Sequence, residues 1–384
     1  MNSRTAGWIA LATILAGALV LAPALLSGRG AEGSGPDTVR NVLQERADNA
    51  GFERVLGPRP LEFPRDHGAH PGYRHEWWYV TGHLRSPEGV WRGFQLTFFR
   101  YGLVPGQAAS LSKWRSNQWV LAHFAVSDPA TGKFHHDART SRAALELAGF
   151  SESDAHLWLG DWQLARDPTD GSWSLAAAGK DATLRLRLAP AKPLVLQGDR
   201  GYSAKSSEPG NASHYYSLPR LSGRGHLRLE GLEHPVEAEA WLDHEWGTSG
   251  LGPAQAGWDW FALQLEDGRE LTFYRLRLQD GGTDPHSRGL LVAADGKAEA
   301  LGHDAVQLHP LRWWQSPASG LRYPVAWEVA IPSRSLAFRL EPVFDAQEWA
   351  DGLRYWEGAV AVSDAASGAA VGRGYLELTG YGPP

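Results

Sequence analysis

The sequence contains no cysteine, and this absence excludes disulfide bonds, thiolate metal ligands and a catalytic thiol. It also lacks a strong excess of either charge, since its 384 residues carry a formal net charge of −6. That balance gives no electrostatic reason to expect binding to nucleic acid. The 15 histidines include no His-Glu-x-x-His spacing, no Gly-x-Ser-x-Gly elbow is present, and no glycine-rich phosphate loop follows a predicted strand. We therefore expect neither a bound metal nor a cofactor.

Long apolar runs are also scarce, and only the stretch from Trp8 to Leu26 is apolar enough to enter a membrane. It follows Arg4, contains Ala22-Pro23-Ala24 and is succeeded by polar, glycine-rich sequence. This order is typical of a secretory signal peptide, and an uncleaved N-terminal anchor has the same pattern. We expect residues 1–30 to be one or the other. The domains that follow are predicted to be periplasmic or secreted, and anchoring to the cytoplasmic membrane would use residues 8–26.

Tryptophan is present in unusual number, with 18 in the chain. The hydrophobic content of 43% and the charged content of 21% are otherwise ordinary for a globular protein. Tryptophan suits strands, which explains part of the excess. Because aromatic side chains are bulky and amphipathic, the excess also indicates a deep apolar cavity or a large contact between domains.

A repeated pattern divides the chain into two similar units. Residues 77–100 show a strand, a glycine turn and a second strand, rich in aromatic and β-branched residues, and residues 258–275 repeat this arrangement. A Gly-Arg-Gly strand at 223–229 returns at 372–378. Because each hairpin opens a unit and each Gly-Arg-Gly strand closes one, the repeat predicts two β domains of similar size.

Short alternating runs separated by turn signals predict an all-β chain of sandwiches or barrels. We expect a linker over residues 31–58, an N-terminal domain over residues 59–232 and a C-terminal domain over residues 233–384. A boundary nearer Gly247 stays open, because the strand before it could complete the first barrel.

The strongest local pattern runs from Val236 to Trp246, where apolar residues occupy the even positions. Successive side chains of a strand point to opposite faces, so His244 and Trp246 are expected to face the interior with this apolar set. One interpretation is a buried histidine that is hydrogen-bonded to a backbone carbonyl. The other is a general acid or base that lines a cavity.

Strand alternation also places two carboxylates of the repeated hairpins on apolar faces. Glu76 shares its face with Trp78 and Val80, and Asp259 shares its face with Phe261. Loss of hydration on an apolar face raises the pKa of a carboxyl group and lets it act as a proton donor near neutral pH. The alternative is that both residues lie at wet strand ends and only cap turns.

Four segments carry a resemblance to a known family, namely Arg74–Leu84, Gly201–Ser203, Leu242–Gly247 and Gly374–Tyr381. They resemble the lipocalin-like family that includes carotenoid 1,2-hydratase (hydroxyneurosporene synthase) and the AttH-type secreted proteins. The resemblance spans roughly residues 60–384. It implies two tandem lipocalin-like β-barrels after the N-terminal apolar segment.

In the carotenoid hydratases of this family, the proposed catalytic set is a His-x-Trp pair followed by a Tyr-x-Asp pair. His244 and Trp246 match the first pair, and Tyr274 matches the tyrosine. Leu276 stands where the hydratases have aspartate, so the proton donor that the resemblance implies is missing here.

Hydration of an isoprenoid double bond requires a protonated acid in an apolar cavity, followed by capture of a carbocation by water. Asp259 and Glu76 are the carboxylates expected to replace the missing acid, with His244 relaying protons. Aromatic faces would stabilise the cation by about 0.5–2 kcal/mol each. The residues expected to line the ligand site are Trp78, Tyr202, Trp246, Trp258 and Trp260.

Three functions follow from these observations. The first is an exported protein that binds a hydrophobic small molecule, an isoprenoid or a lipid. The second is a hydro-lyase that adds water to a carbon–carbon double bond of this ligand. The third is a module without ligand or catalysis that serves a membrane transport complex. A large cavity and an inward carboxylate within hydrogen-bonding reach of His244 would separate them.

Overall fold

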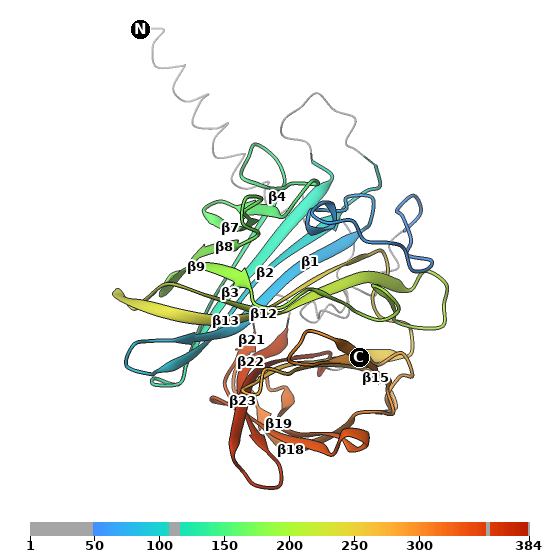
Figure 1. Cartoon of the computed structure of the whole chain (residues 1–384). Helices are drawn as coiled ribbons and strands as arrows, with labels where there is room; N and C mark the ends of the chain where they lie inside the picture. Colours follow the sequence, from blue (N-terminus) through green and yellow to red (C-terminus); the bar gives the residue numbers. More distant parts are fainter. Residues whose placement is uncertain (1–48, 107–115, 351–353, 383–384) are drawn as a thin grey trace, which may run out of the picture. The chain divides into compact units, whose positions relative to one another are not determined.

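The structure is a computed structural model that describes residues 49–106, 116–350 and 354–382 (Figure 1). The predicted signal or anchor segment at residues 1–30 and most of the predicted linker lie outside these ranges. Within them, no helix has the length and apolar character needed to cross a membrane.

The described chain is all-β and forms two large antiparallel sheets. Apart from strands it has two short 3-10 turns, η1 (Arg65–His67) and η2 (Pro332–Arg334). In Figure 1 the first sheet takes the blue to yellow part of the chain and the second takes the orange to red part. Both sheets are barrel-like, which confirms the predicted all-β class.

The first sheet has 13 strands and is nearly closed, because β6, next to the edge strand β5, contacts β3 and β4 at the opposite edge. Arg139 fastens this closure by donating a hydrogen bond of 2.9 Å to the carbonyl of Ala178 and lying 4.6 Å from the ring of Trp162. Two short strands, β10 and β11, pair with β12 beside the main order. From edge to edge the strands are β4 (Lys133–Arg142), β3 (Gln118–Asp128), β2 (Trp91–Gly102), β1 (His75–Arg85), β13 (Leu232–Gly247), β12 (Ala212–Leu229), β9 (Ala182–Pro190), β8 (Trp173–Ala178), β7 (Trp162–Arg166), β6 (His156–Leu159) and β5 (Ala148–Phe150), with β10 (Val195–Leu196) and β11 (Tyr202–Ala204) at the side.

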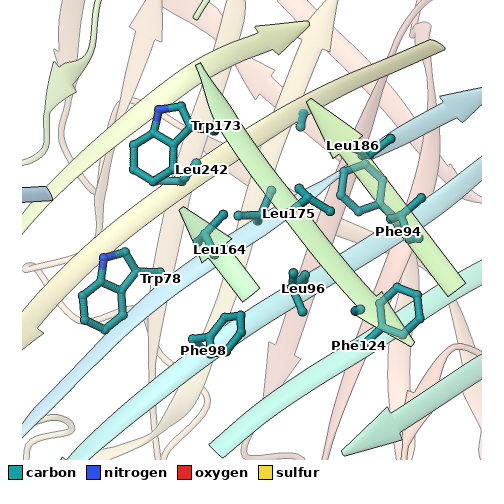
Figure 2. Close-up of a cluster of buried hydrophobic side chains, with 14 of the residues drawn as sticks. Trp78, Phe94, Leu96, Phe98, Phe124, Leu164, Trp173, Leu175, Leu186 and Leu242 are labelled. Atoms are coloured by element: carbon teal, nitrogen blue, oxygen red, sulfur yellow. The ribbon is translucent and has the colours of Figure 1, made fainter. Parts of the chain in front are cut away.

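Side chains fill the interior of the first sheet (Figure 2). The alternation in β9 is typical, since Leu184, Leu186 and Leu188 are buried while Arg185 and Arg187 between them are exposed. Burying one such leucine contributes about 1.5–3 kcal/mol. Figure 2 shows the side chains that meet here from opposite walls, among them Trp78, Phe94, Leu96, Phe98, Phe124, Leu164, Trp173, Leu175, Leu186 and Leu242.

The second sheet has 10 strands and stays open between β17 and β18, so it forms a half-barrel around its own core. Trp327 and Phe261 meet edge to face in this core, with ring centres 5.3 Å apart. One short strand, β21, pairs with β22 beside the main order. The strands are β17 (Ala298–Leu301), β16 (Arg288–Val292), β15 (Glu270–Leu278), β14 (Gln255–Leu265), β23 (Ala370–Thr379), β22 (Tyr355–Asp364), β20 (Leu336–Pro342), β19 (Arg322–Ile331) and β18 (Gln307–Gln315), with β21 (Glu348–Trp349) at the side.

Both predicted hairpins are present, as β1–β2 and as β14–β15. The Gly-Arg-Gly segments lie in β12 and β23, where neighbouring backbone comes very close. A Cβ atom at Gly223 would lie 2.0 Å from the carbonyl oxygen of Arg187, and one at Gly225 would lie 1.9 Å from that of Arg185. Glycine is therefore required at these positions for the strands to approach one another.

The change of sheet falls after Gly247 rather than after Leu232. The predicted boundary between residues 232 and 233 would make β13 the first strand of the C-terminal domain. In the structure β13 pairs with β1 and β12. It therefore belongs to the first sheet, and the second sheet begins at Gln255.

Strand β13 is buried on both faces from Ala240 to Gly247. Its even face packs in the core of the first sheet, where Leu242 and Trp246 lie. Its odd face carries Trp241, which packs against residues of the second sheet such as Trp260. The strand is thus a shared wall between the first core and the contact of the two sheets.

Candidate functional site

A pocket opens where the two sheets meet, and the space between its walls, counted together with the open solvent at its mouth, is about 1040 Å³. Nine aromatic side chains from both sheets line it: Trp77, Tyr79, Phe99, Tyr101, Tyr215, Trp258, Trp260, Tyr274 and Tyr355. Its charged groups are Asp243, Glu245, Lys205 and Glu377.

The odd row of β13 supplies Asp243 and Glu245 to this pocket, while His244 between them points the other way into the first core. The alternation in this strand was therefore predicted correctly, and His244 and Trp246 do face the interior. The pocket lies on the opposite face, because both faces of β13 are covered.

Asp243 lies buried at the pocket wall and accepts three hydrogen bonds. Tyr215 donates at 2.5 Å and the indole nitrogen of Trp241 at 2.6 Å, and Ser217 is the third donor. Burial raises the pKa of Asp243 to about 7, against the three donors, which lower it. This carboxyl group can therefore gain or lose a proton near neutral pH.

Glu377 reaches the pocket from β23 and is partly exposed there. It lies opposite Trp260 across the β14–β23 ladder. Burial and the nearby charge of Asp243 raise the pKa of Glu377 to about 8, while a hydrogen bond with Trp258 lowers it. At neutral pH this carboxyl group is mostly protonated.

Lys205 forms an ion pair with Glu245 within the pocket, with its ammonium nitrogen 2.7 Å from a carboxylate oxygen. Ser213 also donates a hydrogen bond to Glu245. The ammonium lies 4.4 Å from the ring centre of Tyr274, whose hydroxyl is 2.7 Å from Ser203. Burial lowers the pKa of Lys205, but Glu245 and Tyr274 outweigh it and the net shift is upward, so Lys205 stays charged.

A second polar cluster lies on the other side of β13, inside the first core. Nε2 of His244 and Nδ1 of His70 each lie 2.8 Å from the same oxygen of Glu76. Arg100 donates to the other oxygen at 2.8 Å, and the backbone nitrogen of His70 donates to it at 2.9 Å. Glu76 and His244 are both fully buried. An inward carboxylate thus lies within hydrogen-bonding reach of His244, which is one of the two features expected to separate the three functions.

The expected protonation of Glu76 is wrong. Burial acts to raise the pKa of Glu76, but Arg100, His70 and the hydrogen bond from His244 hold it well below its usual range. Burial lowers the pKa of His244 to about 4. Glu76 is therefore a carboxylate and not an acid, and Arg100 is the reason.

Among the described residues, one group offers potential metal ligands whose atoms all lie within 4.8 Å of one another, namely His70, Glu76 and His244. Each of these atoms already has a partner inside the protein. Nε2 of His70 is 2.9 Å from Asp66, and Nδ1 of His244 is 3.1 Å from the Asp66 carbonyl oxygen. A metal would have to displace the bonds to Glu76, so the cluster is best described as a hydrogen-bonded network.

Asp259, expected beside His244, lies instead in the second sheet. It is fully buried and bound by Arg275 at 2.8 Å, by Arg277 at 3.1 Å and by the hydroxyl of Tyr381 at 2.7 Å. It is absent from the pocket lining. The reason is strand alternation, because Asp259 points away from the pocket that its neighbours Trp258 and Trp260 face.

The other expected site residues divide between the two clusters. Tyr274, Trp258 and Trp260 line the pocket, as does Leu276. Trp78 and Trp246 lie in the first core, where the Trp78 ring stacks 4.4 Å from that of His244 and the Trp246 ring 3.9 Å from that of His70. Tyr202 lies on β11 outside the pocket lining.

Sequence reasoning missed the charged groups of the pocket, namely Asp243, Glu245, Glu377 and Lys205. One signal was available, because Trp241 is a large aromatic residue on the same row as Asp243 and indicates that this row is covered too. Glu377 follows the Gly-Arg-Gly repeat on the same row as Tyr375, which gave a weaker signal of the same kind.

Comparisons with known proteins agree with this architecture. The family model of AttH-like proteins matches residues 54–381. An AttH protein from Nitrosomonas europaea of known crystal structure is 38% identical, with a TM-score of 0.77, and the match covers 86% of this chain and 100% of that one. Kievitone hydratase from Nectria haematococca shares the fold at 13% identity and a TM-score of 0.65, over 86% of this chain and 98% of its own. No curated protein sequence matches. On the family match and the 38% identity, the chain belongs to the AttH-like family.

Proposed function

We propose that the protein binds a hydrophobic small molecule, an isoprenoid or a lipid, in the pocket between its two sheets. The observation that carries this proposal is the pocket itself, with its wall of nine aromatic side chains. The interior of the first sheet is filled by its own side chains, so the space for a ligand lies between the sheets. Export by residues 1–30 belongs to the same proposal and would place the pocket in the periplasm or outside the cell.

Hydration of a double bond in the bound molecule is the second candidate. It is favoured by two carboxyl groups that line the apolar pocket, Asp243 and Glu377, whose pKa values are raised by burial to about 7 and about 8. A carboxyl group that holds its proton near neutral pH is what acid-catalysed addition of water needs. The fold shared with kievitone hydratase is compatible with this chemistry but does not establish it.

The binding proposal is tested by titrating the full-length protein with farnesol, a C15 isoprenoid alcohol, and following tryptophan fluorescence. Trp77, Trp258 and Trp260 line the pocket and should report its occupation. In the variant Leu251→Arg a charge enters the pocket lining, and we expect affinity for farnesol to fall at least about tenfold.

Leu311→Arg is the matched control, because Leu311 is an exposed leucine on β18 outside the pocket lining. It should bind farnesol as the wild type does. If neither farnesol nor a long-chain fatty acid alters the fluorescence of the wild type, the binding proposal fails and the interaction module becomes the better description.

A further inference from the structure

We infer that Glu377 is the proton donor of this pocket and that it acts on an electron-rich carbon–carbon double bond of the bound molecule. The inference rests on the proposed binding function and names both the reacting group and the class of substrate. It replaces the acid–base candidates Asp259, Glu76 and His244, because these three residues lie outside the pocket lining.

Glu377 reaches the pocket beside two of its tryptophans. Strand β14 lies between β15 and β23, and it presents Trp258 and Trp260 to the pocket. Leu276 of β15 is opposite Trp258, and Glu377 of β23 is opposite Trp260. Leu276 and Glu377 therefore reach the same pocket from the two sides of the tryptophan pair. The carboxyl group missing at Leu276 is present on the other side.

The surroundings of Glu377 favour a carboxyl group that keeps its proton. Asp243 shares the pocket wall, and Glu357 is the neighbour of Glu377 across the β22–β23 ladder. The ammonium of Lys205 is bound to Glu245. Burial disfavours the charged form of Glu377, and ionisation of both Glu377 and Asp243 would place two negative charges in this apolar space, so the pKa of Glu377 is raised to about 8.

Glu357 is itself fully buried and accepts a hydrogen bond from the hydroxyl of Tyr79. Burial and the charge of Glu377 hold the pKa of Glu357 well above its usual range. Burial does the same to the hydroxyls of Tyr79 and Tyr375, so these groups stay neutral. Of the two carboxyl groups, Glu377 reaches the pocket, so Glu377 is the one that can meet a ligand.

The aromatic wall suits the intermediate that such a proton transfer creates. The carboxyl O–H bond of Glu377 breaks, and the π electrons of the double bond form a new C–H bond. The adjacent carbon becomes a carbocation, which faces such as those of Trp258, Trp260 and Tyr215 can stabilise. Water then forms the C–O bond and returns a proton to Glu377, so that alkene and water give an alcohol and the acid is restored.

Two probes of the same length test this inference in the full-length protein by isothermal titration calorimetry. Farnesol is the neutral probe, and N,N-dimethylfarnesylamine is an ammonium at pH 7 that stands in for the carbocation. We expect the ammonium to bind about tenfold more tightly than farnesol. Since its charge favours the ionised form of Glu377, its binding should release close to one proton, measured from the dependence of the heat on buffer ionisation.

Glu377→Gln should lose both the preference for the ammonium over farnesol and most of the proton release. Glu377→Asp should retain proton release, and Glu266→Gln, at an exposed glutamate outside the pocket lining, should behave as the wild type. If farnesol binds but proton release is absent or is unchanged in Glu377→Gln, the inference about Glu377 is wrong and the binding function stands. If farnesol does not bind the wild type, the binding function itself fails.

Discussion

Replacing Glu76 by glutamine should destabilise the fold while leaving the pocket intact. Glu76 accepts hydrogen bonds from Arg100 and from the backbone of His70, and the change leaves the Arg100 guanidinium without its charge partner. Arg100 is 1% exposed and Glu76 is 0% exposed, so water cannot compensate. Removing one partner of a buried ion pair costs about 3–5 kcal/mol.

Thermal unfolding followed by circular dichroism measures this loss. A loss of 1 kcal/mol lowers the melting temperature of a domain of 150–250 residues by about 2–4 °C, so we expect a fall of roughly 6–20 °C. Glu266→Gln, at an exposed site, should change it little. The affinity of the folded variant for farnesol should match that of the wild type. A variant of normal stability that no longer binds farnesol would refute the structural role assigned to Glu76 and His244.

Two further predictions concern the charged groups of the pocket. The pKa of Glu377 in the folded protein is about 8, above the 4.5 of an ordinary glutamate. Protonation of Glu377 therefore stabilises the fold fully below pH 4.5, and this contribution is lost as the pH rises to about 8. Between pH 5 and pH 9, the stability of Glu377→Gln in urea unfolding should therefore fall less than that of the wild type. Lys205→Met leaves the buried Glu245 without its partner and should cost about 3–5 kcal/mol, whereas Lys205→Arg keeps the ion pair and should cost less. An equal loss in both Lys205 variants would contradict this assignment of the ion pair.

Much of the fold could be predicted from the sequence because strand alternation and turn glycines are local signals. The hairpins β1–β2 and β14–β15 follow from them directly. The place of β13 could not be predicted in the same way, because the choice between the two sheets depends on pairing with β1, about 160 residues earlier in the chain. That pairing is visible only in three dimensions.

The site was harder to predict for a physical reason. Alternation in β13 separates His244 from Asp243 correctly, but it does not say which face meets a cavity when both faces are buried. The state of Glu76 depends on Arg100, which approaches from β2 and has no signal near Glu76 in the sequence. Glu377 enters the pocket from the last strand of the chain, far in sequence from Asp243.

The most direct test of the central claim is the electron density of the protein crystallised with farnesol. We expect the ligand between the two sheets, against Trp258 and Trp260 and within reach of Glu377 and Asp243. Density for farnesol inside the first sheet, beside His244 and Trp246, would contradict it and return the site to the other face of β13.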